Sequence, residues 1–380
     1  MRILIAAGGT GGHIFPALAV LRCLSEQVDG LEVRWLGGHR GLEAGIVPAA
    51  GYQLDRLWLR SLRTVDLSVN TVADPIRLGA SVPQTMALLA RWRPRAVLTT
   101  GGYLSIPVLT AARAARVPTL IWAGDRLPGK SIRTTARLAS AIAVSFEGSC
   151  EALPGACFVT GTPIRRLAGI ERAAARQRLR LPATVPLLLV FGGSQAVRRL
   201  NDAVAGALPD LLTRAAVLHI TGQPAYAEAL RRREALPEEQ RARYRPYPSL
   251  QAEMADALAS ADLLIGRAGS STLAEAAAVG LPLVVVPYPH AAAHQVANAR
   301  RLLDAGGALV IADEDFDAAA LLEASTILDQ PERLARMSAA SRGEARPAAA
   351  RAVTELLLSL AERRPLPTAD HIERISREAA

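Results

Sequence analysis

The sequence predicts an α/β protein composed of two Rossmann-like domains. Short runs rich in leucine, valine and isoleucine alternate with longer alanine-rich stretches, as in parallel sheets whose faces are covered by helices. With 380 residues, the chain is longer than one hydrophobic core usually supports. Two apolar runs end in a glycine-rich turn that leads into a helical stretch, at residues 8–12 and 192–194, which indicates that a similar fold begins twice.

The order of the apolar runs predicts the strands of each domain. In the first domain we expect strands near Ile3–Ala7, Leu31–Leu36, Ala96–Thr100, Thr119–Trp122, Ala141–Val144 and Phe158–Val159. In the second we expect Leu187–Phe191, Val217–Ile220, Leu263–Ile265, Leu283–Val286 and Ala308–Ile311. The predicted domains are residues 1–163, residues 164–362, whose last helix could pack back on the first domain, and a polar tail at 363–380.

The composition excludes several classes of protein. A hydrophobic content of 50% with only 21% charged residues is incompatible with global disorder. No apolar run approaches the roughly 18 to 20 residues that cross a bilayer, and the opening segment is too short for a signal peptide, so we expect a cytosolic chain. The three cysteines Cys23, Cys150 and Cys157 lack C-x-x-C spacing, which predicts packed thiols rather than a disulfide framework or a zinc site.

Basic residues are concentrated in the first domain. Residues 1–160 contain 17 arginines and lysines against 10 acidic residues. Apolar residues interrupt the arginines at Leu57–Arg63 and Arg91–Arg93, which favours contact with an anionic membrane surface. Arginines that only solvate the surface are the alternative. No nucleic-acid-binding motif accompanies the charge, so we expect no nucleic-acid partner.

The glycine-rich turns are candidates for phosphate binding, because a helix that follows such a turn presents unpaired N–H groups and a partial positive charge. The first turn lacks both the G-x-G-x-x-G pattern and a P-loop lysine, which disfavours a nicotinamide cofactor. The turns at 192–194 and 266–271 lie in the second domain and could together hold a nucleotide diphosphate. Glycines that serve only the geometry of a strand-to-helix turn are the alternative for each of them.

His13 directly follows the first glycine turn and is a candidate general base. A helix N-terminus disfavours a protonated imidazole, which leaves the neutral side chain able to accept a proton. A polar residue that satisfies the donors at the helix end is the alternative. His290 and His294 are four residues apart but have no third ligand nearby, so we expect no metal.

Two acidic motifs occur in the second domain. Glu275 lies three residues after Thr272, which is the spacing of a capping box, although its carboxylate could instead accept two ribose hydroxyls. Asp313, in Asp313–Asp315, imitates a D-x-D metal pattern but is surrounded by other acids, which predicts a solvated loop.

Several motifs together resemble the MurG-type peptidoglycan N-acetylglucosaminyltransferases of glycosyltransferase family 28. The resemblance covers residues 1 to about 355, with the motifs in family order, at residues 8–19, 100–105, 161–165, 191–195, 267–275, 287–290 and 295–299. An ordered set of this kind is more specific than any single glycine turn.

The resemblance implies a GT-B fold, in which two Rossmann-like domains face a central cleft. It implies inverting transfer of N-acetylglucosamine from UDP-N-acetylglucosamine to the 4-hydroxyl of undecaprenyl-pyrophosphoryl-N-acetylmuramoyl-pentapeptide, which converts lipid I to lipid II in peptidoglycan synthesis. The polyprenyl-pyrophosphate-linked acceptor would place the enzyme at the cytoplasmic face of the cell membrane, as a peripheral protein. No cofactor and no metal is implied.

The resemblance also assigns roles to residues at matching positions. His13 would be the catalytic base, and the acceptor would be received by Thr10, Gly11, Gly12, Tyr103 and Asp125. The donor would be held by Arg165 and Ser194 at its phosphates, by Glu275, with Thr272 nearby, at the ribose, and by Gln295, Asn298 and His294 at the sugar.

Some positions depart from the family pattern. Ala123-Gly124-Asp125 stands where the family has Glu-Gln-Asn, Gly161-Thr162-Pro163 replaces Gly-Asn-Pro, and His294-Gln295 replaces a glutamine pair. The acceptor side departs most, so a related transferase acting on diacylglycerol, another lipid or a natural product is the first alternative. A UDP-N-acetylglucosamine 2-epimerase and a nucleotide-sugar-binding subunit without activity are two others.

Overall fold

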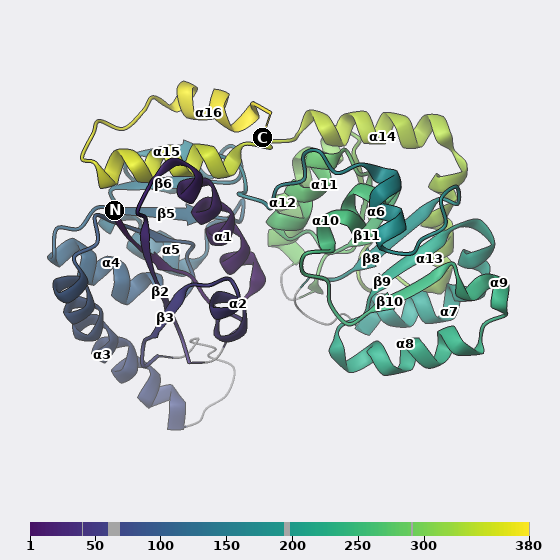
Figure 1. Ribbon diagram of the computed structural model, residues 1–380, viewed down its shortest axis with the longest axis horizontal. Coiled ribbons are helices and arrows are strands. Elements are labelled where there is room, and N and C mark those ends of the chain that lie inside the picture. The colour runs from purple at the N-terminus through teal and green to yellow at the C-terminus, as the bar shows by residue number, and fades with distance from the viewer. Residues whose placement is uncertain (40, 60–68, 194–197, 290–291, 380) are drawn as a thin grey trace. The chain divides into compact units, whose positions relative to one another are not determined.

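The chain divides into two compact units, Met1–Ile164 with Arg346–Ala380 and Arg165–Ala345. The computed structural model (Figure 1) describes all residues except 40, 60–68, 194–197, 290–291 and 380. Within these described residues each unit is an α/β layer structure around one parallel sheet, as the alternation of apolar runs predicts.

The first unit contains a seven-stranded sheet in the described residues, with the order β3-β2-β1-β4-β5-β6-β7 and every pair parallel. The strands are β1 (Arg2–Ala6), β2 (Glu32–Gly37), β3 (Gln53–Arg56), β4 (Ala96–Thr99), β5 (Thr119–Ala123), β6 (Ala141–Val144) and β7 (Cys157–Val159). The helices are α1 (Gly11–Gln27), α2 (Glu43–Ala49), α3 (Val69–Trp92), α4 (Ser105–Ala114), α5 (Lys130–Thr135), α15 (Ala349–Ala361) and α16 (Ala369–Arg377), with 3-10 turns at Ala136–Leu138 and Cys150–Ala152.

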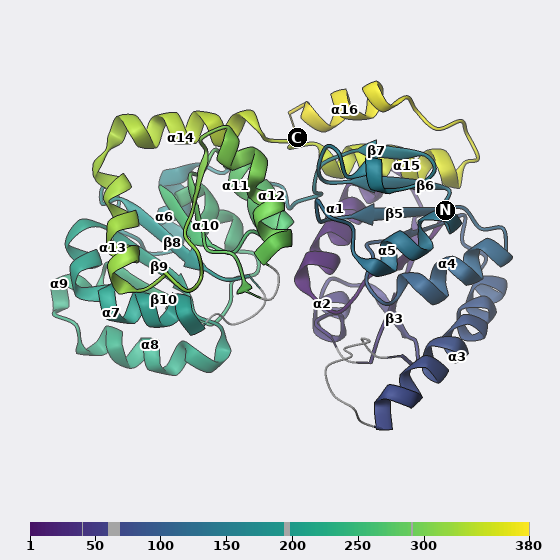
Figure 2. The ribbon, with the colours of Figure 1, turned by 180° about the vertical axis from the view of Figure 1, so that it is seen from behind.

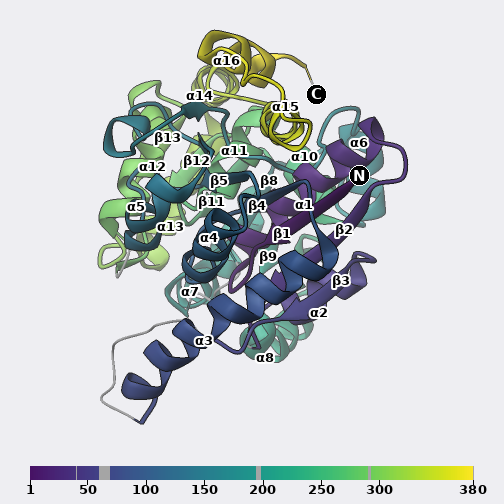
Figure 3. The same cartoon turned by 90° about the vertical axis from the view of Figure 1, so that its left-hand side faces the viewer.

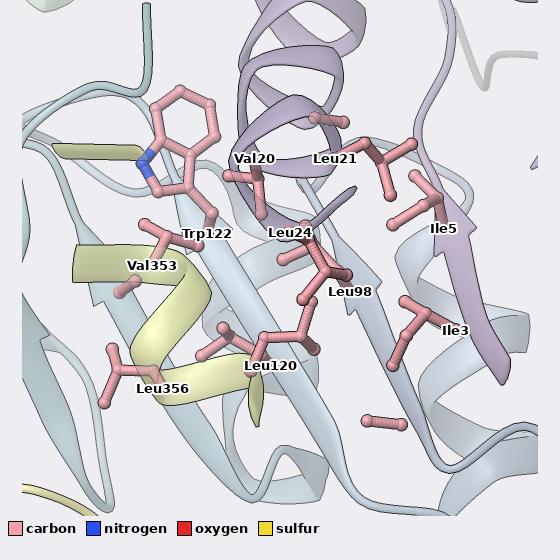
Figure 4. Close-up of a cluster of buried hydrophobic side chains, with 14 of the residues drawn as sticks. Ile3, Ile5, Val20, Leu21, Leu24, Leu98, Leu120, Trp122, Val353 and Leu356 are labelled. Atoms are coloured by element: carbon pink, nitrogen blue, oxygen red, sulfur yellow. The ribbon is translucent and has the colours of Figure 1, made fainter. Parts of the chain in front are cut away.

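The last two helices of the chain belong to the first unit. Val353 and Leu356 on α15 are fully buried among side chains such as Leu120 and Leu24 (Figure 4). Ile372 on α16 is buried in the same core. The expectation that the last helix before residue 362 packs back on the first domain is therefore confirmed, and the second unit ends at Ala345. The segment after residue 362 is more than a polar tail, because α16 adds its apolar face to the same core.

The second unit contains a six-stranded parallel sheet in the described residues, with the order β10-β9-β8-β11-β12-β13. Its strands β8, β9 and β10 lie side by side in Figure 2. Its strands are β8 (Leu187–Phe191), β9 (Ala216–Ile220), β10 (Tyr244–Tyr247), β11 (Leu263–Gly266), β12 (Leu283–Val285) and β13 (Ala308–Val310). Its helices are α6 (Arg172–Arg178), α7 (Arg198–Arg214), α8 (Gln223–Ala235), α9 (Glu238–Arg241), α10 (Met254–Ser260), α11 (Ser270–Val279), α12 (Ala292–Asp304), α13 (Ala318–Ser325) and α14 (Pro331–Gly343), with a 3-10 turn at Thr326–Asp329.

The strands β3 and β10 were not predicted from the sequence. Each lies at the edge of its sheet. β3 reads Gln-Leu-Asp-Arg, which is too polar for a buried run, and β10 contains Pro246, which is tolerated in an edge strand because one side of that strand needs no ladder donor.

The prediction that all three cysteines are packed thiols is wrong for two of them. Cys150 and Cys157 form a disulfide, with their Cα atoms 5.6 Å apart, and Cys23 is a partly buried free cysteine. The loop between the second 3-10 turn and β7 folds back and brings the two cysteines together, so the pairing needs no C-x-x-C spacing.

Among the described residues, no helix combines the length and the apolar character that crossing a bilayer requires.

Candidate active site

The turn between β1 and α1 positions the first set of site residues. Gly9 has φ +89°, a conformation that favours glycine, and Thr10 is the extended residue that precedes the helix. The carbonyl of Thr10 accepts hydrogen bonds from the N–H groups of His13 at 3.1 Å and Ile14 at 3.3 Å. Gly11, Gly12 and His13 therefore form the first turn of α1.

The hydrogen bonding of His13 determines its tautomer. Nδ1 of His13 lies 2.7 Å from the carbonyl oxygen of Thr100, at the end of β4. A carbonyl can only accept, so Nδ1 carries the proton and Nε2 keeps its lone pair. His13 is thus a neutral imidazole with a basic nitrogen directed away from its anchor.

Burial lowers the pKa of His13 below the ordinary value of 6.5, and the bond to Thr100 and the charges of Asp125 and Glu43 partly oppose this effect. The neutral form therefore prevails at physiological pH. A base that is unprotonated at the working pH is what general base catalysis requires.

A second glycine turn adjoins His13. Gly101 and Gly102 follow β4 with φ of +92° and +75°, and a Cβ at Gly102 would lie 3.7 Å from Nε2 of His13. Tyr103 comes next and lies against the first turn, since a Cβ at Gly9 would be 3.7 Å from its ring. Burial, reinforced by the charge of Glu43, raises the pKa of Tyr103 to about 12, so its phenol remains a neutral donor.

Asp125 completes the group in the first unit. It follows β5, is exposed, and acts electrostatically on His13. The acceptor-side residues predicted from the sequence thus come from the carboxyl ends of β1, β4 and β5, which are neighbouring strands. Ligands of open α/β sheets bind at this end of the strands.

Arg165 and Glu275 form an ion pair in the second unit. Nε of Arg165 lies 2.7 Å from Oε1 of Glu275, and Nη1 of Arg165 donates to the carbonyl of Gln251 at 2.7 Å. Burial raises the pKa of the Glu275 carboxyl, and the Arg165 guanidinium opposes that rise. The capping-box interpretation is wrong, because α11 begins at Ser270 with Gly269 at its N-cap, and Thr272 lies inside the helix.

The predicted sugar-binding residues occupy different environments on α12. Oε1 of Gln295 accepts the backbone N–H of Tyr288 at 2.9 Å, which holds the loop after β12. Asn298 is buried and its amide nitrogen donates to the carbonyl of Ala268 at 3.3 Å, which tethers the loop after β11. His294 is exposed. Ser194 and His290 lie outside the described residues.

Arg267 and Asp313 form a buried ion pair that the sequence did not reveal. The Asp313 carboxylate is 2.6 Å from Nη1 of Arg267 and 3.1 Å from Nε of Arg199. Arg267 also donates to the carbonyls of Val286 and Pro287 at 2.8 and 2.9 Å. The prediction of a solvated loop at Asp313 is wrong, because its charge is compensated by Arg199 at the start of α7 and by Arg267 in the loop after β11.

Two Rossmann-like units are the architecture of the GT-B fold. The first unit contains the neutral imidazole of His13 and the second contains the Arg165–Glu275 pair, groups of the kind that a nucleotide-sugar enzyme needs. The glycosyltransferase family 28 N-terminal domain matches residues 3–144 and the family 28 C-terminal domain matches residues 187–353. The chain belongs to glycosyltransferase family 28 and is a glycosyltransferase.

Individual relatives agree with this assignment. The UDP-N-acetylglucosamine--N-acetylmuramyl-(pentapeptide) pyrophosphoryl-undecaprenol N-acetylglucosamine transferase of Methylococcus capsulatus is 39% identical over 94% of this chain and 98% of its own. The protein of the same name from Lactococcus lactis is 37% identical over 90% of this chain and 94% of its own. The crystal structure of Acinetobacter baumannii MurG has a TM-score of 0.73 and 27% identity, covering 94% of this chain and 99% of that one.

A more distant structure shares only the fold. A putative UDP-N-acetylglucosamine 2-epimerase from Listeria monocytogenes has a TM-score of 0.70 at 14% identity, covering 97% of this chain and 98% of that one.

Proposed function

We propose that this chain transfers N-acetylglucosamine from UDP-N-acetylglucosamine to the 4-hydroxyl of undecaprenyl-pyrophosphoryl-N-acetylmuramoyl-pentapeptide, with inversion at the anomeric carbon. The observation that carries the proposal is the defined tautomer of His13, whose Nε2 is left basic by the 2.7 Å bond from Nδ1 to Thr100. The names of relatives that are 36–39% identical over at least 90% of the chain support the choice of donor and acceptor.

The chemistry assigns one step to His13. The acceptor oxygen attacks the anomeric carbon, the bond from that carbon to the diphosphate oxygen breaks with its electron pair, and the hydroxyl proton passes to Nε2 of His13. Tyr103, neutral at the working pH, can donate a hydrogen bond to the acceptor. Thr10, Gly11 and Gly12 are the other residues that we propose to receive it.

The leaving diphosphate needs stabilisation of its developing charge. Arg165 supplies a guanidinium for this purpose, and the N-terminus of α11 supplies N–H groups and a partial positive charge. We propose that the ribose hydroxyls donate to Glu275, which Arg165 already holds in place, and that Gln295 and the other residues of α12 contact the sugar. No metal ion takes part in this proposal.

Radiolabel transfer tests the proposal. The chain is incubated with labelled UDP-N-acetylglucosamine and purified muramoyl-pentapeptide lipid, with diacylglycerol as a parallel acceptor, each with and without EDTA. Product on the muramoyl lipid that survives EDTA is expected. Product on diacylglycerol alone would mean that Asp125 and the other departures mark a changed acceptor. Formation of the epimerised donor without any acceptor would indicate a 2-epimerase. Binding of the donor without any turnover would indicate a nucleotide-sugar-binding subunit without activity.

We also propose that the first unit binds an anionic membrane as a peripheral protein at the cytoplasmic face. Three exposed apolar side chains of the first unit support this: Trp58, which precedes α3, and Ile76 and Met86 on α3, exposed by 57, 64 and 42% (Figure 3 shows α3 against α4). The Arg77 guanidinium carbon lies 5.7 Å from the centre of the Trp58 ring. Basic residues beside exposed apolar ones favour anionic lipid. Arg60 and Arg63 lie outside the described residues.

Vesicle sedimentation tests the membrane proposal. The double variant Trp58→Ala with Ile76→Ser should reduce binding to phosphatidylglycerol vesicles. The control Leu309→Ser removes an exposed apolar side chain from the second unit and should leave binding unchanged. Equal binding of all three proteins to anionic vesicles, or equal binding of the unaltered chain to neutral vesicles, would contradict the proposal.

A further inference from the structure

Glu43 is a fully buried acid in the first unit, at the first position of α2. Removal of a carboxylate from water is costly unless hydrogen bonds replace its hydration. Glu43 lies outside the glycine turns and the family motifs, so its burial needs a separate physical explanation.

Two backbone N–H groups from different loops supply the hydrogen bonds. Gly9, in the turn before α1, donates to Oε2 of Glu43 at 2.8 Å. Gly38, just after β2, donates to Oε1 at 3.0 Å. One carboxylate therefore joins the glycine turn that precedes His13 to the loop that follows the neighbouring strand.

The surrounding glycines make room for this carboxylate. A Cβ at Gly8 would lie 2.6 Å from Oε1 of Glu43, and a Cβ at Gly37 would lie 2.8 Å from its Cγ. A Cβ at Gly41 would collide with the carboxylate as well. None of these three glycines has a positive φ, so the backbone conformation does not require glycine at these positions. Glycine is required there because Glu43 takes up the space that a Cβ would need.

The charge of Glu43 also reaches the reactive groups. It raises the pKa of Tyr103, whose hydroxyl would be 2.5 Å from a Cβ at Gly38. Glu43 and Asp125 are the two acids that raise the pKa of His13 against the effect of burial. A negative group inside the turn also disfavours a phosphate at the same N–H groups, because like charges repel.

We propose that Glu43 is a positioning residue for the transfer reaction: it accepts the N–H group of Gly9 in the first glycine turn and that of Gly38 in the loop after β2, and so holds the turn, and with it His13, in the catalytic arrangement. The inference rests on the proposed function. It implies that the acceptor pyrophosphate is not bound by the N–H groups of Gly9 and Gly38, in contrast to what a glycine turn before a helix suggests from sequence.

Two variants of Glu43 separate shape from charge. Glu43→Gln keeps the shape but places an amide NH₂ opposite one of the two N–H donors, so turnover should fall by on the order of 10²-fold as the turn shifts. Its loss of negative charge should also move the acid limb of the pH–rate profile to lower pH. Glu43→Asp keeps the charge, so its acid limb should stay near that of the unaltered chain although its shorter side chain lowers turnover. Affinity for UDP, measured by calorimetry, should not change in either variant.

Hydrogen exchange gives a readout independent of activity. The peptides that contain Gly9 and Gly38 should exchange faster in Glu43→Gln than in Glu32→Gln, a matched loss of an exposed acid in the same unit. Normal turnover and exchange in Glu43→Gln would overturn the inference. Lost turnover with an unmoved acid limb and unchanged exchange would overturn it too, since Glu43 would then act by some other route.

Two glycine substitutions provide the test if Glu43→Gln fails to fold. Gly8→Ala should lower turnover by displacing the carboxylate, whereas Gly45→Ala, whose Cβ would meet nothing within 4 Å, should not. Equal activity of these two variants would refute the inference. Absence of product from the unaltered chain on the muramoyl lipid would refute the proposed function instead, while the exchange measurement would still decide whether Glu43 holds the turn.

Discussion

Replacement of His13 by alanine tests the proposed mechanism most directly. Nδ1 of the side chain donates to the carbonyl of Thr100 at 2.7 Å, and Nε2 is the proposed proton acceptor. A general base contributes about 10²- to 10⁴-fold in rate, which corresponds to about 3 to 5 kcal/mol in the activation free energy. We therefore expect kcat of His13→Ala to fall by that factor. Affinity for UDP should be unchanged, because the proposed donor residues belong to the second unit.

Single-turnover transfer to the muramoyl lipid is the assay that isolates this step. The control is His371→Ala, which removes a partly exposed histidine from α16 and should leave turnover unchanged. In the unaltered chain the rate should decline only as the pH falls below about 6.5, since burial lowers the pKa of His13 and the neutral form is the base. Full single-turnover activity of His13→Ala, or an acid limb that is identical in the variant and the unaltered chain, would refute the assignment.

Three further predictions concern stability and donor binding. Leu356→Ala should lower the unfolding free energy by about 2 to 5 kcal/mol in chemical denaturation, because Leu356 is fully buried in the core of the first unit, and a loss below about 1 kcal/mol would contradict that placement. Glu275→Gln should weaken UDP binding about 10- to 100-fold by calorimetry, because it removes both a charge-assisted acceptor and the anchor of Arg165; unchanged affinity would exclude the ribose role. Burial lowers the pKa of His219 to about 3, so the folded state binds its proton less readily than the unfolded chain does. The unfolding free energy should then decrease as the pH falls from about 6.5 to about 4.5, by about 2 kcal/mol, and a decrease of equal size in His219→Gln would show that other groups cause it.

The fold and the order of most elements followed from local sequence. Buried parallel strands are continuous apolar runs, and β1, β4, β5 and β8 were recognised for this reason. The edge strands β3 and β10 were missed, since one side of an edge strand faces away from the sheet and its residues can be polar or proline.

The site was predicted unevenly. His13, Tyr103, Arg165 and Glu275 are recognisable because each lies in or beside a motif with glycines at fixed spacing. Asp313 resembled a solvated acid because its compensating arginines are distant in sequence, with Arg199 more than a hundred residues before it.

Local sequence specifies the alternation of strands and helices, the positions of the glycine turns and the motifs of the family, because these depend on residues close together in the chain. The folded chain is needed to show that α16 joins α15 in the core of the first unit, that Cys150 pairs with Cys157, and that the Glu43 carboxylate is buried between Gly9 and Gly38. Burial and hydrogen-bond partners are properties of the folded chain, which brings together groups that no local pattern connects.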